Sequence, residues 1–242
     1  MTGEVDSRGR IGILGGGQLG RMLALSGYPL GLAFAVLDPK ERVSASKVCG
    51  HIEADYDDPE ALDELAEWAD VVTYEFENVP EEALERVAGE VPVFPPRGAL
   101  EMSDDRRTEK RFFRNLGIET TDTLAVDSLE ELEQAVEEIG LPVILKTRTG
   151  GYDGKGQAVI EHRPQLRDAW ESVGERPSIT EAMVDFDREL SVIGTRGRDG
   201  ATRIYPVVEN HHEDQILVES RAPAQFAERE RAKTAGSYCR RI

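Results

Sequence analysis

Short apolar runs alternate with amphipathic stretches over the first hundred residues. The apolar runs predict strands, and they lie at 10–14, 32–37, 71–74 and 91–94. The stretches between them predict helices at about 18–26, 59–68 and 80–87. Strands that alternate with helices indicate a parallel sheet covered on both faces. Prolines at 92, 95 and 96 mark a boundary, so we expect a Rossmann-like α/β domain over residues 1–100.

The pattern changes after this boundary. Periodic apolar positions predict helices at 104–115, 128–139 and 164–173. Between and after them, short apolar runs predict strands at 143–145, 158–160, 179–184, 188–195 and 202–209. Several of these strands are joined directly by turns. The second part of the chain is therefore expected to be α+β with mainly antiparallel strands.

A glycine-rich loop joins the strands at 143–145 and 158–160. Such a hairpin needs only about two to five loop residues, and this one is longer, with four glycines between 150 and 156. Glycines let backbone N–H groups approach a ligand closely. Lys146 ends the first strand and Lys155 lies in the loop, so the segment suits a polyphosphate. It lacks the order of a P-loop, and a mobile surface hairpin is the alternative interpretation.

The run KTRTGGYDGKGQ at 146–157 resembles the glycine-rich loop of the N5-carboxyaminoimidazole ribonucleotide synthetases, the purine-biosynthesis branch of the ATP-grasp superfamily. The resemblance extends from residue 10 to about residue 223. It implies a Rossmann-like domain, an ATP-grasp lid subdomain over 101–184, and the start of a catalytic lobe over 185–242. The activity implied is ATP-dependent carboxylation of 5-aminoimidazole ribonucleotide with bicarbonate, which makes the chain a carbon–nitrogen ligase.

An earlier glycine motif supports a rival function. Gly-x-Gly-x-x-Gly at 15–20 follows a strand and opens a helix, and Asp38 closes the next strand. This is the dinucleotide-binding pattern, so a nicotinamide-dependent oxidoreductase is the alternative enzyme class. The family resemblance instead implies that this segment holds the phosphate of the imidazole ribonucleotide, through Gly17, Gln18 and Leu19. A tight turn without a ligand is the third interpretation.

The segment TYEFENVP at 73–80 follows the third strand, at the edge of the sheet where open α/β sheets bind ligands. It resembles a family segment close to the ribonucleotide, which implies that Glu75 and Asn78 meet its hydroxyl groups. A plain helix start at Pro80 is compatible with this role.

The resemblance also implies a nucleotide pocket. The residues expected to bind ATP are Arg106, Lys146, Gly151, Tyr152, Asp153, Gly154, Lys155, Gly156, Gln157, Glu181, Ala182, Met183, Val184, Glu189 and His212. Four of them are also expected to serve catalysis: Lys146, Tyr152, Asp153 and Lys155. Glu181 would accept from the adenine amine and Glu189 would take the ribose hydroxyls. The pair His211–His212 lacks a third ligand at suitable spacing, so we expect no metal site there.

The net charge of the chain disfavours some classes of binding partner. A formal net charge of −18, with 47 acidic and 29 basic residues, disfavours nucleic acid and anionic membranes. The scarcity of lysine relative to arginine suggests a halophile, with ordinary acidic helix faces as the alternative. Two cysteines make no disulfide framework, and no apolar run reaches the length of a membrane span. We therefore expect a cytoplasmic protein that acts on small molecules, with a homodimer as one option.

The end of the chain departs from the family. Family members continue for well over a hundred residues past this point, and that part carries the carboxylates that bind Mg²⁺. The segment 232–242 is basic in an otherwise acidic chain, so we expect a truncated or frame-shifted ending or an artificial boundary. Three hypotheses remain: the ligase or an inactive fragment of it, the nicotinamide enzyme, and a non-catalytic nucleotide-binding remnant.

Overall fold

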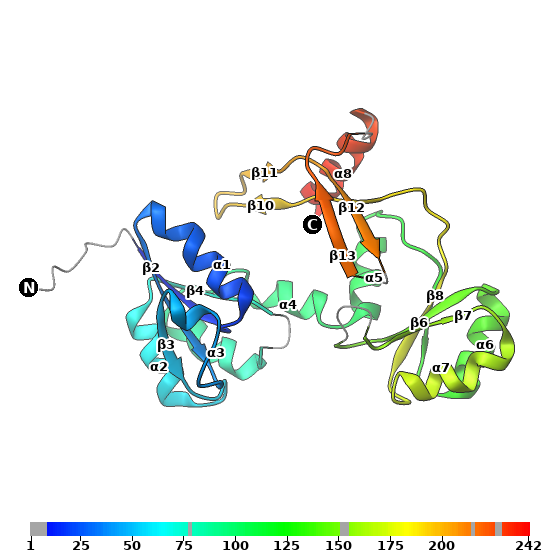
Figure 1. The fold of residues 1–242 in the computed structure, drawn as a ribbon, viewed down its shortest axis with the longest axis horizontal. Helices are drawn as coiled ribbons and strands as arrows, with labels where there is room; N and C mark the ends of the chain where they lie inside the picture. Colours follow the sequence, from blue (N-terminus) through cyan, green and yellow to red (C-terminus); the bar gives the residue numbers. More distant parts are fainter. Residues whose placement is uncertain (1–8, 77–78, 151–154, 214–215, 226–228) are drawn as a thin grey trace, which may run out of the picture. The chain divides into compact units, whose positions relative to one another are not determined.

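The chain folds into two compact units, Met1–Asp104 and Asp105–Ile242 (Figure 1). The computed structural model describes residues 9–76, 79–150, 155–213, 216–225 and 229–242, with the side chains of 229–233 left out. The boundary falls four residues after the predicted position at residue 100. The further division of the second unit near residue 184 stays a prediction.

A parallel sheet forms the centre of the first unit. Its strands are β1 (Gly9–Leu14), β2 (Leu32–Asp38), β3 (Gly50–Glu53) and β4 (Val71–Tyr74), in the order β3-β2-β1-β4. The helices are α1 (Gln18–Gly27), α2 (Pro59–Trp68), α3 (Glu81–Glu90) and α4 (Arg97–Ser103), with 3-10 turns at Tyr28–Leu30 and Ala45–Lys47. The predicted parallel α/β arrangement is therefore confirmed.

Separate hydrophobic clusters lie on the two faces of this sheet. Ile13 and Val36 pack with Ala24 of α1 on one face. Leu14 and Val72 pack with residues of α2 and α3 on the other. Side chains of successive strand residues point to opposite faces, so adjacent residues such as Ile13 and Leu14 supply both cores. The sheet is thus fixed from both sides, and the loops at its carboxyl edge have a rigid base.

A second, antiparallel sheet begins the other unit. It contains β5 (Thr123–Val126), β6 (Val143–Thr147), β7 (Gln157–Ile160) and β8 (Ser178–Ala182), in the order β5-β8-β6-β7. The helices α6 (Leu129–Ile139) and α7 (Leu166–Ser172) cover one face, with a 3-10 turn at Arg163–Gln165 before α7 (Figure 1). Helix α5 (Arg106–Asn115) precedes β5.

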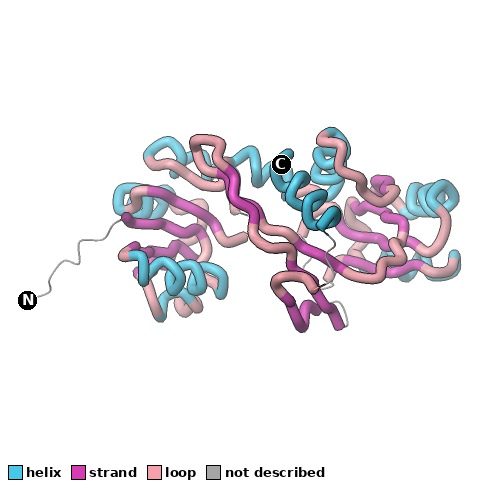
Figure 2. The backbone as a smooth tube through the Cα atoms, turned by 90° about the horizontal axis from the view of Figure 1, so that it is seen from above, coloured by secondary structure: helices cyan, strands magenta, loops and turns pink. Residues whose placement is uncertain are grey.

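The remaining strands are short and antiparallel. One sheet has the order β13-β12-β9 and is built from β9 (Glu189–Ser191), β12 (Val208–Glu213) and β13 (Ile216–Arg221). A hairpin joins β10 (Gly194–Arg196) to β11 (Thr202–Ile204). The chain ends in helix α8 (Arg229–Arg241), with the C-terminus beside it in Figure 2. Arg196 donates to the carbonyl of Arg240 at 2.8 Å, which ties α8 to this hairpin.

Some sequence predictions were wrong. The segment 91–94 makes only an isolated bridge between Val93 and Val72, because prolines at 92 and 95 lack N–H donors. The single strand predicted over 188–195 is interrupted between β9 and β10, and the one over 202–209 is broken around Pro206. The strands β3, β5 and β13 and the helices α4 and α8 were not predicted. In the described residues, no helix is long and apolar enough to span a membrane.

Candidate functional site

One face of the sheet in the second unit carries three of the described residues expected to bind ATP. In the ladder, Ile144 lies opposite Glu181 and Lys146 opposite Ile179. Directly paired residues of antiparallel strands share a face. Lys146 is also paired with Gln157 of β7, so Lys146, Gln157 and Glu181 lie on one face of the sheet. The opposite face, with Val143 and Leu145, packs against α6 and α7.

A buried carboxylate lies on this site face, between two lysines. The Glu181 side chain is only 7 % exposed. Lys146 donates to Glu181 Oε2 at 2.9 Å, and Lys110 of α5 reaches Glu181 Oε1 at 3.1 Å. Burial raises the pKa of Glu181, but the ammonium groups of Lys146 and Lys110 outweigh it, so the pKa lies below its usual value. Glu181 is therefore ionised and held by two cations.

Helix α5 brings further charged groups to the same place. Arg106 donates to the carbonyl of Gly150 at 2.9 Å and to that of Thr147 at 3.3 Å. These contacts hold the end of β6 where the glycine-rich loop begins. Glu109 is half-buried, and burial raises its pKa against the opposing charges of Lys110 and Arg106. The cluster thus combines three cations, Lys146, Lys110 and Arg106, with the carboxylates of Glu181 and Glu109.

An N-cap fixes the start of α5. Asp105 accepts from the backbone N–H groups of Arg107 and Thr108, at 2.8 and 3.3 Å. The same carboxylate accepts from Arg148 Nε at 2.9 Å. Arg148 follows β6 directly, so Asp105 joins the helix to the strand that carries Lys146. Burial raises the pKa of Asp105, but Arg148 and the two amides lower it further than burial raises it.

The glycine-rich loop is described only in part. The expected ligands Gly151, Tyr152, Asp153 and Gly154 lie outside the described residues. Gly156 has a φ of +69°, a left-handed conformation that favours glycine, and its carbonyl accepts from Thr147 at 2.9 Å. Lys155 is exposed beside it. These contacts close the hairpin at the base of the loop.

The segment 182–184, which is expected to bind ATP, has backbone groups that are partly paired within the unit. The N–H of Ala182 donates to the Asp122 carbonyl at 2.9 Å, and its carbonyl accepts from Thr121 Oγ1 at 2.9 Å. The N–H of Met183 donates to the Pro142 carbonyl at 3.2 Å. Among the described residues, the N–H of Val184 has no acceptor. The N–H groups of Ala182 and Met183 are therefore already paired within this unit.

Glu189 and His212 are brought together on another sheet. His212 Nδ1 lies 3.5 Å from Glu189 Oε1, across the pair β9–β12. Over the described part of the chain, no group of three histidine, cysteine or acidic side chains is arranged to hold a metal ion. The role expected for Glu189 toward the ribose hydroxyls and the role expected for His212 in binding ATP stay predictions.

Glu75 accepts hydrogen bonds from the backbone of the glycine motif in the first unit. Its carboxylate accepts from the N–H of Gly17 at 2.6 Å and from that of Gly20 by a short contact. Gln18 and Leu19, which follow Gly17, are exposed. The structure thus joins Glu75 to the glycine motif, as an internal acceptor at the N-terminus of α1. Asn78 lies outside the described residues.

The rival interpretation assigns the carboxylate of Asp38 to a ribose. Asp38 is buried, and its carboxylate accepts hydrogen bonds from other residues of the unit. Gly16 N–H donates to its Oδ2 at 2.9 Å, and Lys40 N–H to its Oδ1 at 3.0 Å. Tyr56 donates to Oδ2 at 3.2 Å, and burial with the charge of Asp38 raises the pKa of this phenol. Asp38 therefore joins the loops around it, and both of its carboxylate oxygens already accept hydrogen bonds within the unit.

Protein-family models match both units. A model described as an ATP-grasp domain covers residues 111–242, more than half of the chain. A second, described as a ribonucleotide synthetase preATP-grasp domain, covers residues 9–104.

This chain belongs to the ATP-grasp family.

Several curated and solved relatives of this ATP-grasp chain are named N5-carboxyaminoimidazole ribonucleotide synthases or synthetases. The N5-carboxyaminoimidazole ribonucleotide synthase of Pseudomonas aeruginosa is 48 % identical over 208 residues, which are 86 % of this chain and 58 % of that protein. The Thermus thermophilus synthetase structure has a TM-score of 0.88 at 46 % identity, covering 96 % of this chain and 62 % of the other. The Aspergillus clavatus synthase, solved with ADP and 5-aminoimidazole ribonucleotide, has a TM-score of 0.85 at 30 % identity, covering 96 % and 61 %. The chain thus spans about three fifths of their length.

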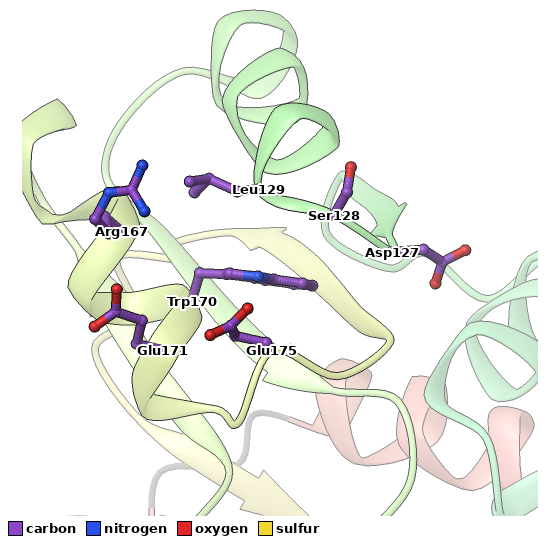
Figure 3. Close-up of a pocket in the computed structure, with 7 residues that line it drawn as sticks. All are labelled: Asp127, Ser128, Leu129, Arg167, Trp170, Glu171 and Glu175. Atoms are coloured by element: carbon purple, nitrogen blue, oxygen red, sulfur yellow. The ribbon is translucent and has the colours of Figure 1, made fainter.

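Two pockets of this ATP-grasp chain differ in whether predicted site residues line them. One, of about 440 Å³, lies beside the glycine motif of the first unit, with Gly17 and Glu75 in its wall together with Lys40 and Arg42. The other, of about 400 Å³, is shown in Figure 3 and contains none of the predicted site residues. It is lined by Trp170, Arg167 and Glu171 of α7 and by residues at the start of α6. Of these two pockets, the first is the one lined by predicted site residues.

Sequence reasoning missed Lys110, Asp105 and Glu109. Lys110 follows Arg106 by four residues, a spacing that places both on the same face of a helix. That spacing was the signal in the sequence that could have identified Lys110 as a site residue. The contact with Glu181 depends on how α5 docks against the sheet, which the pattern of residues does not reveal.

Proposed function

We propose that this chain supplies the nucleotide-binding and ribonucleotide-binding parts of an ATP-dependent carboxylase. The reaction is the conversion of 5-aminoimidazole ribonucleotide and bicarbonate to N5-carboxyaminoimidazole ribonucleotide in purine biosynthesis. The observation that carries this proposal is the site face of β6, β7 and β8, where Lys146, Gln157 and Glu181 lie together beside the glycine-rich loop. The relatives named above, and their complexes with ADP, support it.

In the proposed reaction, bicarbonate attacks the γ-phosphorus of ATP, and ADP leaves. The resulting carboxyphosphate breaks down to CO₂ and phosphate, and the 5-amino group of the imidazole attacks the CO₂. Lys146 supplies a point charge toward the transferred phosphoryl group. Arg106 holds the first carbonyls of the glycine-rich loop, and that loop would exclude water from the labile acyl phosphate.

The loop side chains Tyr152, Asp153 and Lys155 would face the imidazole and the bicarbonate. In the first unit, the pocket beside Gly17 would receive the ribonucleotide, with its phosphate near Gln18 and Leu19. Lys40 and Arg42 line the same pocket and add positive charge for that phosphate. Glu75 and Asn78 would meet the hydroxyl groups, which for Glu75 requires release of an α1 amide.

Mg²⁺ is expected with ATP in this family, but the described residues offer no set of ligands for it. No step is therefore assigned to the metal. A homodimer, a cytoplasmic location and adaptation to high salt belong to the same proposal and rest on the sequence alone.

Binding of the two small molecules tests the proposal. In calorimetric titrations we expect ADP and 5-aminoimidazole ribonucleotide each to bind to this chain. Lys146→Met should weaken ADP binding by about tenfold or more and leave the ribonucleotide affinity unchanged. Lys47→Met, an exposed lysine of the first unit, is the matched control. NADH binding without competition from ADP would instead support the oxidoreductase.

A further inference from the structure

Two lysines from different elements share one buried carboxylate. Lys146 lies on β6 and Lys110 on α5, and each approaches a separate oxygen of Glu181, at 2.9 and 3.1 Å. The lysines are themselves only 25 and 22 % exposed. Glu181 therefore keeps an ammonium partner if either lysine moves away.

This redundancy matters because Lys146 has a second task under the proposed function. When the ammonium of Lys146 moves toward a nucleotide phosphate, its contact with Glu181 Oε2 weakens, because its three N–H donors are then divided between two anions. A buried carboxylate that loses all its partners is strongly destabilising, which would oppose such a movement. The contact with Lys110 removes most of that cost.

We propose that Lys110 is a positioning residue that keeps Glu181 ionised and in place when Lys146 transfers to the phosphates of the bound nucleotide. The transfer step rests on the proposed function; the sharing of Glu181 does not. Helix α5 is suited to this task because Asp105 caps it and is bound to Arg148. Arg106 is not a substitute, since its guanidinium donates to the carbonyls of Thr147 and Gly150.

A stability cycle without nucleotide tests the sharing. The variants are Lys110→Met, Lys146→Met, the double variant, and the double variant with Glu181→Gln, at about pH 8, where Glu181 is ionised. Each single change should lower the calorimetric midpoint by less than about 3 °C, and the double change by about 6–20 °C, more than the sum. Adding Glu181→Gln should recover most of that loss. Additive losses, or no recovery, would overturn the sharing and leave the proposed function standing.

ADP binding tests the transfer. Lys110→Met should weaken ADP by about tenfold, and Lys110→Arg, which keeps a cation, by less than about threefold. In the Glu181→Gln background, Lys110→Met should change the affinity by less than about twofold, because Lys110 acts through Glu181. An equal loss in both backgrounds would show direct contact with the nucleotide, and no loss in either would also overturn the proposal. Absence of ADP binding to the unaltered chain would contradict the proposed function itself.

Discussion

Replacing Glu75 by alanine tests how the first unit holds its glycine motif. Helix α1 begins after Gly17, which has no side chain to cap it. The carboxylate of Glu75, 58 residues later in the chain, accepts from the N–H of Gly17 at 2.6 Å and also from that of Gly20. Glu75→Ala removes both acceptors and the negative charge at the helix N-terminus.

The expected loss follows from these contacts. Hydrogen bonds to a charged group contribute about 1.5–3 kcal/mol each, and a charge at a helix N-terminus about 0.3–1 kcal/mol. Glu75 is only half-buried, so water replaces part of what is lost. We expect a total of about 2–4 kcal/mol for Glu75→Ala and about half of that for Glu75→Gln, which keeps one acceptor oxygen. With a urea m-value of about 2 kcal/mol/M, the midpoint should fall by about 1–2 M.

Urea unfolding followed by circular dichroism measures this loss. Glu64→Ala, an exposed glutamate within α2, is the control and should change stability by less than about 0.5 kcal/mol. Inorganic phosphate should stabilise Glu75→Ala more than the unaltered chain, because the freed amides form an anion site. If Glu75→Ala is as stable as the control, the carboxylate does not cap α1, and the reasoning is refuted.

The other predictions concern the second unit and the whole chain. Asp105→Ala should destabilise more than Asp58→Ala, an N-cap of α2 without an arginine partner, by about 1 kcal/mol in urea unfolding; equal losses would show that the pair with Arg148 contributes nothing. Burial raises the pKa of Glu109 in the folded chain, so its ionised form opposes folding above that pKa. Glu109→Gln should therefore raise the thermal midpoint at about pH 7 but not near pH 4, and a lower midpoint at neutral pH would contradict this. With a net charge of −18, the thermal midpoint should rise with KCl, because salt screens the self-repulsion; a flat curve would remove the salt-adaptation hypothesis.

The sequence pattern predicted those helices and strands correctly whose local signals agree with the fold. The strands β1 and β2 are continuous apolar runs, and α2 starts with an Asp58 cap followed by Pro59, so both kinds of element were predicted within a residue or two. The hairpin β6–β7 was predicted from the glycines between its strands. These elements carry Lys146, Gln157 and the glycine motif of the first unit. The approximate position of the candidate site could therefore also be predicted from the sequence.

Other features depend on contacts between distant residues. The strand β3 contains Gly50 and His51 and becomes a strand because β2 pairs with it. The segment 91–94 has the composition of a strand, but its prolines cannot donate to a neighbour. The contact of Lys110 with Glu181 spans 71 residues of sequence, and that of Glu75 with Gly17 spans 58. Neither contact has a local signature.

An ADP titration observed on isoleucine methyl groups by NMR tests the central claim most directly. Ile144 and Ile179 share the face of the sheet with Lys146 and Glu181, whereas Ile13 lies at the end of β1, next to the glycine motif of the first unit. If the nucleotide binds on the site face, the signals of Ile144 and Ile179 shift with ADP and that of Ile13 does not. A shift of Ile13 alone would place the nucleotide at the first glycine motif and contradict the account.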